Sequence, residues 1–264
     1  MGRYHYYRMH PLTLPEVLEN VSAGKPDAQI KRLLEFGGFP EPYLKQSQKT
    51  LKRWHLQRRD RIVYSDIRDL ENVKEISNIE LLINALPERV GSPVSRKNLA
   101  QALDVDFKTV EKWLTILQNV YYCYRISPYG APKIKAVKKE QKLYLWDWSE
   151  LDAEGPKWEN FVASHLLKFC HFHEDTQGEK MELRFLRNSE GREVDFVVLN
   201  KNKPLFAVEC KAGERTLSPH LKYFAERTSI PKFYQVHQGQ RSIAIDDRIS
   251  ILPFAEFCKE VNLI

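Results

Sequence analysis

The sequence predicts a protein of the α+β class, and three observations support this. Residues 1–75 contain helix-entry signals and helical runs. Residues 76–148 contain short capped helices followed by two strand-like runs, Tyr121–Ile126 and Lys142–Trp146. Residues 149–264 carry a helix, three short strands, a second helix and a further strand, which is the order of an α/β sandwich. We therefore expect three domains with these boundaries.

The three short strands of residues 183–213 carry charges where a core strand should be apolar. The runs are rich in Val, Phe and Leu and are separated by turn formers, which predicts an antiparallel meander of Leu183–Arg187, Glu193–Leu199 and Leu205–Lys211. Asp195 is a lone carboxylate in its run, and alternation places Glu209 and Lys211 on one strand face. Burying such groups is costly unless they are paired or bind a cation.

Asp195, a hairpin and then Glu209-Cys210-Lys211 resemble the D…(D/E)xK signature of the PD-(D/E)XK nuclease superfamily. That family places a glutamate on the helix before the meander. Here this position corresponds to Glu159, at the edge of the apolar stripe Trp158, Phe161, Val162, Leu166 and Phe169. The resemblance implies a restriction-endonuclease-like fold with Glu159, Asp195, Glu209 and Lys211 as its catalytic residues.

These residue types suit metal-dependent phosphodiester cleavage. Two carboxylates projecting together, Asp195 and Glu209, form a hard oxygen site for Mg²⁺ or Mn²⁺, and Glu159 is a further ligand or an outer base. Such an ion polarises a phosphate and lowers the pKa of its bound water. Lys211 can orient or deprotonate that water. The structural alternatives are a buried Glu–Lys pair beside an edge aspartate, or a nuclease fold that has lost its activity.

Residues 76–148 predict a winged helix-turn-helix. Ser95 and Asp106 are N-cap residues for two short helices, and two strands follow the second helix. Lys108, Thr109 and Lys112 lie on the expected outer side of that second helix, where groove contacts would be made. The lysine-rich segment 133–139 would be the wing. The alternative role is a structural or protein-docking module.

The N-terminal region resembles a second family. Gly2-Arg3, Pro11–Glu16, Gly37–Glu41 and Arg61 followed by Asp66-Ile67 resemble the lid and linker of AAA-type ATPases that carry a C-terminal domain of the DUF4143 type. This resemblance covers essentially the whole chain and implies that residues 1–75 are a helical lid remnant. The sequence contains no GxxxxGK[ST] phosphate loop, so we expect no ATP site in this chain. We expect a fragment, the second half of a split gene, or a natural truncated paralogue.

Other charged and metal-ligating residues give weaker signals. Arg58, Arg59 and Arg61 are either nucleotide-sensing remnants or, with Lys52 and Arg53, a solvated basic face, and the second interpretation is favoured. His165, His171 and His173, with Glu174 and Asp175, invite a metal interpretation, but a solvated turn is favoured over a chelate. The four cysteines have no CxxC spacing, which indicates neither a disulfide framework nor a zinc site.

Composition sets broad limits on the function. The chain has 264 residues and a net charge of +6, which mildly favours a polyanionic partner. No apolar run reaches membrane-spanning length, so the sequence predicts a cytoplasmic protein without a membrane partner. The predicted function is Mg²⁺- or Mn²⁺-dependent cleavage of DNA, beside an ATPase partner or a missing N-terminal ATPase domain. The alternative is a non-catalytic DNA- or protein-binding adaptor that works with an ATPase in trans.

Overall fold

The computed structural model describes residues 5–20, 24–67, 76–130, 140–211, 213 and 216–264, and backbone alone for 65–67. Gly2-Arg3 and the predicted wing, 133–139, lie outside these residues. The α-helices are α1 (Leu14–Asn20), α2 (Pro26–Phe36), α3 (Pro40–Lys45), α4 (Gln48–Arg61), α5 (Ile76–Ala85), α6 (Arg96–Ala102), α7 (Phe107–Asn119), α8 (Glu154–Gln177), α9 (Pro219–Arg227) and α10 (Phe254–Glu260). Three short helical segments join them: η1 (Ile62–Ile67), η3 (Pro87–Arg89) and η4 (Trp148–Glu150).

The described strands form one mixed β-sheet. These are β1 (Cys123–Pro128), β2 (Lys142–Leu145), β3 (Met181–Arg187), β4 (Glu193–Asn200), β5 (Lys203–Cys210), β6 (Lys232–His237), β7 (Ile243–Ala244) and β8 (Ile249–Pro253). Their order is β2-β1-β3-β4-β5-β6-β8-β7. The meander β3-β4-β5 is antiparallel, whereas β6 runs parallel to β5 and β8 runs parallel to β6. The order helix, meander, helix, strand is therefore confirmed, but β8 was not predicted.

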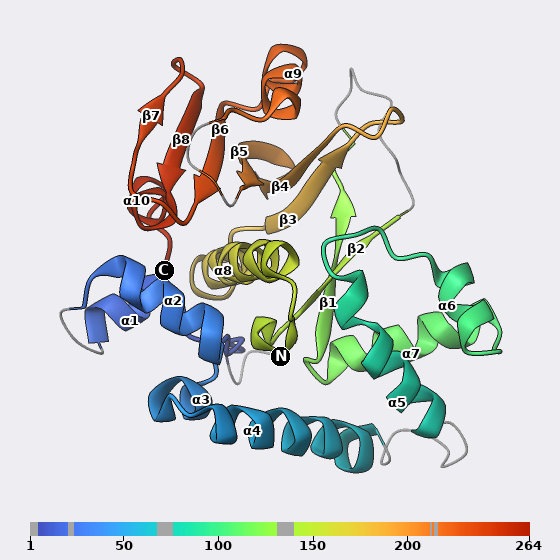
Figure 1. Ribbon diagram of the computed structural model, residues 1–264. Helices are drawn as coiled ribbons and strands as arrows, with labels where there is room; N and C mark the ends of the chain where they lie inside the picture. The colour runs from blue at the N-terminus through green and yellow to red at the C-terminus, as the bar shows by residue number, and fades with distance from the viewer. Residues whose placement is uncertain (1–4, 21–23, 68–75, 131–139, 212, 214–215) are drawn as a thin grey trace.

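The 24-residue helix α8 lies at the centre of the molecule, against the sheet (Figure 1). The apolar stripe predicted for it is buried and joins the core cluster that contains Phe196, Val208 and Tyr234. On the other side of the sheet, Leu221 and Phe224 of α9 pack with a second cluster of strand residues. Because α8 and α9 cover opposite faces, strand residues of both parities are buried.

Local signals explain where the elements begin and turn. The backbone N–H of Thr13 and its hydroxyl both donate to the Glu16 carboxylate, as in a capping box at the start of α1. Between β4 and β5, Lys201 and Asn202 have positive φ angles of 48° and 66°, which suits a two-residue hairpin turn. The turn starts the pairing of β4 with β5, and the register then shifts by one residue between Val198 and Leu199, before the strands reach Asp195 and Glu209.

The segment after α5 builds a compact helical unit on the sheet edge. The Ser95 and Asp106 side chains accept hydrogen bonds from the backbone N–H groups of Asn98 and Lys108, so both predicted N-caps are confirmed. α6 packs on α7, β1 pairs antiparallel with β2, and Pro93 bridges to Lys142 of β2. At its far end β1 also pairs with β3, which joins this unit to the meander.

No helix in the described part of the chain is both long and apolar enough to cross a lipid bilayer.

Candidate active site

The candidate site lies at the ends of β4 and β5, and β2 and α8 contribute to it. Phe196 is opposite Val208 in the antiparallel pair, so the next residues, Asp195 and Glu209, come opposite each other. The Cys210 backbone N–H donates to Oδ2 of Asp195 at 2.8 Å. The hairpin therefore brings together the two carboxylates that the sequence predicted as metal ligands.

Glu209 is buried, with 3% of its surface exposed, and has two polar partners. Its Oε1 accepts a hydrogen bond from the Ser218 hydroxyl at 3.1 Å and pairs with the Lys211 Nζ at 2.8 Å. Both contacts use Oε1, so Oε2 takes no hydrogen bond from the described residues. Ser218 is held in place because its backbone N–H donates to the buried side chain of Gln235, the residue opposite Glu209 on β6. The Lys211 side chain remains about half exposed.

Lys142 of β2 lies between the remaining carboxylates. Its Nζ is 3.0 Å from Oε1 of Glu159, 2.5 Å from Oε1 of Glu193 and 3.6 Å from Oδ1 of Asp195. Glu193 also pairs with the more exposed Arg187, at 3.5 Å. A single ammonium group thus contacts one carboxylate from α8 and two from β4.

Glu159 is enclosed by two residues of β2 and by the turn at Gly91. The Tyr144 hydroxyl donates to its Oε1 at 2.7 Å, and Lys142 shares the same oxygen. On the other side, a Cβ added to Gly91 would lie 2.9 Å from Oε2 of Glu159, so a larger residue there would displace this carboxylate. Gly91 also has a φ of +76°, which favours glycine. Glu159 therefore belongs to the cluster because Lys142 contacts both Glu159 and Asp195.

The electrostatics of the cluster follow from burial. Burial first, and then the negative charge of Asp195, raise the pKa of both Glu159 and Glu209 to about 7. Burial lowers the pKa of Lys142, but Glu159, Asp195 and Glu193 outweigh this effect and raise it overall. Burial also lowers the pKa of Lys211, but the contact with Glu209 raises it by more, so the pKa is higher than the ordinary value. Both lysines are therefore charged at neutral pH.

The donor set restricts which metal ion would fit. The described residues contain no group of three or more His, Cys, Asp or Glu side chains arranged to hold a metal ion. Asp195 and Glu209 are two oxygen donors next to each other, and among the described residues none donates a hydrogen bond to Oε2 of Glu209. Mg²⁺ commonly binds through one or two carboxylates and keeps several waters, so the pair fits that ion and does not fit a closed zinc site.

Three partners of the site were not identified from the sequence: Lys142, Glu193 and Tyr144. The sequence does carry a signal for Lys142, because this lysine is the first residue of an otherwise apolar strand. Glu193 and Tyr144 lie in predicted strands and carry no motif. Their roles follow only from the pairing of β1 with both β2 and β3.

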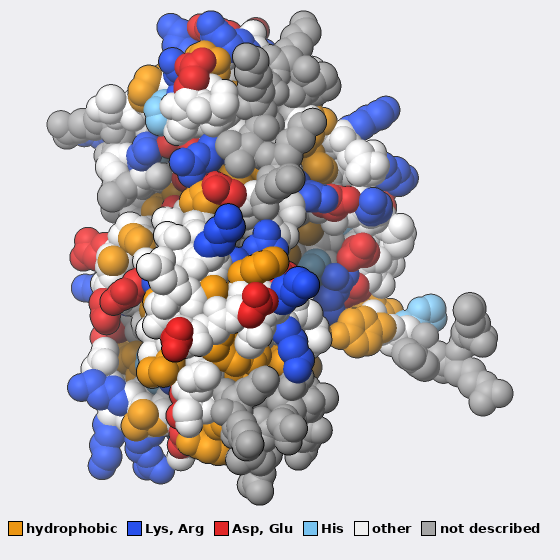
Figure 2. Space-filling model, turned by 90° about the vertical axis from the view of Figure 1, so that its right-hand side faces the viewer, with side chains coloured by type: hydrophobic (Ala, Val, Ile, Leu, Met, Phe, Trp, Pro, Cys, Tyr) orange, Lys and Arg blue, Asp and Glu red, His pale blue; other side chains and the backbone are white. Residues whose placement is uncertain are grey.

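The residues predicted to contact DNA lie on α7, which Figure 1 places well away from β4 and β5. Lys108 and Lys112 are exposed, and Thr109 is half-buried. On the face shown in Figure 2, the described lysines and arginines are interspersed with acidic side chains rather than gathered into one basic surface. The α7 residues and the carboxylate cluster are therefore two separate candidate sites.

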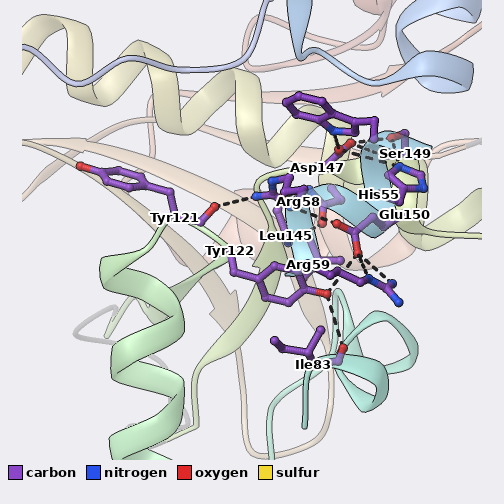
Figure 3. A network of polar contacts seen from close by, with 12 residues as sticks. His55, Arg58, Arg59, Ile83, Tyr121, Tyr122, Leu145, Asp147, Ser149 and Glu150 are labelled. Atoms are coloured by element: carbon purple, nitrogen blue, oxygen red, sulfur yellow. Dashed lines mark hydrogen bonds and ion pairs between the residues drawn. The ribbon is translucent and has the colours of Figure 1, made fainter. Parts of the chain in front are cut away.

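Of the basic residues on α4, Lys52, Arg53 and Arg61 are exposed, but the interpretation as a solvated basic face is wrong for Arg58 and Arg59. Both pair with Glu150, whose side chain is 0% exposed, at 3.0 and 2.9 Å (Figure 3). The Tyr122 hydroxyl donates to the same carboxylate, at 3.1 Å. This network fixes α4 against η4 and the start of β1. It is satisfied within the protein and needs no ligand to explain it.

The favoured solvated turn at His171–Asp175 is also wrong, because these residues belong to α8. His171 is hydrogen-bonded to His10 at 2.9 Å, and Arg8 pairs with Glu174 and with Asp175. The fully buried His165 accepts a hydrogen bond from the Leu14 backbone N–H. These histidines fix the N-terminal segment on α8.

The described residues form an α+β fold with a mixed sheet, a central helix and a carboxylate–lysine cluster at one hairpin. Residues 154–257 match the family model described as "Domain of unknown function (DUF4143)", which confirms the DUF4143 part of the resemblance. Residues 27–153 match a second model, "Domain of unknown function (DUF8612)". The region that matches DUF8612 thus supplies Lys142 and Tyr144 to the cluster. The region that matches DUF4143 supplies its carboxylates, which are Glu159, Glu193, Asp195 and Glu209.

Two curated relatives are similar to this chain, and both are described as uncharacterized. A protein of Methanocaldococcus jannaschii is 24% identical over 248 residues, covering 85% of this chain and 54% of the relative. A protein of Haemophilus influenzae is 23% identical over 216 residues, covering 78% of this chain and 52% of the relative. The chain thus spans about half the length of these relatives. No solved structure is significantly similar to it.

Proposed function

We propose that residues 149–264 form a PD-(D/E)XK-type domain that cleaves DNA phosphodiesters with Mg²⁺ or Mn²⁺. The observation that carries this proposal is the cross-strand placement of Asp195 and Glu209, with Lys211 on Glu209. The raised pKa of Glu209 supports it, because a buried carboxylate next to a second carboxylate is stabilised in its charged form by a bound cation.

The proposed roles divide between binding and turnover. Asp195 and Glu209 would hold the ion. When bound, it would polarise the scissile phosphate and lower the pKa of an attacking water. The half-exposed Lys211 would orient that water and stabilise the charge that develops on the phosphate. Glu159 keeps Lys142 and Tyr144 in place on the inner side of the site.

We further propose that residues 76–148 bind duplex DNA as a winged helix-turn-helix, with α7 as the recognition helix. The supporting observations are the packing of α6 on α7, the β1–β2 hairpin beside them, and the exposed Lys108 and Lys112. We also propose that an ATPase region lies outside this chain, and the greater length of the relatives is consistent with it. The division of the chain into three domains is likewise a proposal.

The test combines melting with cleavage. Wild type, Asp195→Asn and Lys211→Met are melted with and without Mn²⁺, and each is incubated with labelled single- and double-stranded DNA. We expect Mn²⁺ to raise the melting temperature of wild type and Lys211→Met but not of Asp195→Asn, because binding to the native state stabilises it. Only wild type should cleave. Glu226→Gln, an exposed carboxylate on α9, is the control and should behave as wild type.

The competing function is the non-catalytic adaptor. A wild-type protein that shows no Mn²⁺-dependent shift and cleaves neither DNA substrate would overturn the nuclease proposal. DNA binding that persists in such a protein would support the adaptor.

A further inference from the structure

Lys142 is an unusual component of the site, since lysine is seldom fully buried. Its exposed surface is 0%, and its backbone is fixed by pairing with Ile126 and by the bridge to Pro93. Its ammonium group has three hydrogens, and three carboxylates, those of Glu159, Glu193 and Asp195, lie within 3.6 Å. The lysine is therefore positioned as a fixed cation inside the protein.

The two sides of Asp195 carry different partners. Oδ1 faces Lys142, while Oδ2 accepts the hydrogen bond from Cys210, the neighbour of Glu209. Sites that use two metal ions place them roughly 3.5–4 Å apart on shared carboxylates. A second divalent ion between Asp195 and Glu159 would compete for the space and the oxygens that the ammonium group already uses. Like charges at such a distance repel strongly in a buried site.

We propose that Lys142 takes the place of a second metal ion, so that the site binds one divalent ion, on the Asp195–Glu209 side. This inference rests on the proposed metal-dependent function. It makes Lys142 a positioning residue, because it would hold Asp195 and Glu159 in place without touching substrate. It also makes the site composite: the region that matches DUF8612 supplies the cation, and the DUF4143 region supplies the metal ligands.

The experiment counts Mn²⁺ ions on the full chain by electron paramagnetic resonance and measures affinity by calorimetry. We expect one ion per wild-type chain and one per Lys142→Arg chain, because arginine retains the charge. Lys142→Met should bind a second Mn²⁺ or bind the first at least tenfold more tightly. Lys168→Met is the matched control: it removes another largely buried lysine, paired with Glu16 at 2.5 Å, away from the cluster. It should leave ion count and affinity unchanged.

The outcomes separate this inference from the function on which it rests. Two ions on wild type, or equal count and affinity for wild type and Lys142→Met, would overturn the inference and leave the metal-dependent function intact. An ion bound by Lys142→Met but not by wild type would overturn that function and still support Lys142 as the resident cation. No ion on either protein would overturn both. If circular dichroism shows that Lys142→Met is unfolded, the variant Lys142→Met with Glu193→Gln replaces it, because it removes one charge of each sign and keeps Asp195 and Glu159.

Discussion

Without a divalent ion, Glu209 should make the protein less stable as pH rises. Its pKa in the folded state is about 7, against an ordinary value of 4.5, because the carboxylate is buried and faces Asp195. A folded-state pKa above the unfolded one means that the folded protein binds the proton more tightly. The stability from this proton is fully present below pH 4.5 and is lost as pH rises through 7.

The size of this effect follows from linkage. Each unit of pKa difference corresponds to about 1.4 kcal/mol, so Glu209 should account for a loss of about 2–3 kcal/mol between pH 5 and 8. For a chain of this size that loss lowers the melting temperature by roughly 5–8 °C. Glu209→Gln has a neutral side chain of similar shape, so its melting curve should lack this part of the pH dependence.

The assay is thermal melting from pH 5 to 8 in chelator, for wild type, Glu209→Gln and Glu41→Gln. Glu41 is an exposed carboxylate whose pKa is lowered by Lys45, so its removal should leave the pH dependence of wild type unchanged over this range. Mn²⁺ at pH 8 should restore most of the wild-type loss and none in Glu209→Gln. Parallel curves for wild type and Glu209→Gln would refute the reasoning, since the buried carboxylate would then titrate as an ordinary one.

Two further predictions concern other parts of the chain. Glu150→Ala leaves Arg58 and Arg59 without their buried partner and should destabilise the protein by about 3 kcal/mol in urea unfolding; a loss under about 1 kcal/mol would contradict the network's role. Changing Lys108 and Lys112 to Glu together should weaken duplex binding and flatten its salt dependence in fluorescence anisotropy, because fewer counterions are released. Unchanged affinity and slope would instead locate DNA contact away from α7.

The sequence determined the hairpin and its charged residues because these depend on short-range rules. Alternation places Glu209 on the opposite strand face from Phe206 and Val208, and these two residues are buried in the core cluster that also contains the apolar stripe of α8. The turn at Lys201-Asn202 starts the hairpin, and a one-residue register shift between Val198 and Leu199, which the sequence did not predict, then brings Asp195 opposite Glu209. N-caps at Ser95 and Asp106 were predictable for the same reason, since a cap involves only the next few residues.

Only the tertiary structure decided which charges share the site. Lys142 is the first residue of a short strand. No pattern near it in the sequence indicates that Glu159, Glu193 and Asp195 are its partners. It reaches them because β1 pairs with β2 on one side and with β3 on the other, and because α8 crosses beneath. The partnership of Arg58 with Glu150 likewise depends on how α4 packs. Such contacts depend on the packing of elements that are distant in the chain, and no local pattern encodes that packing.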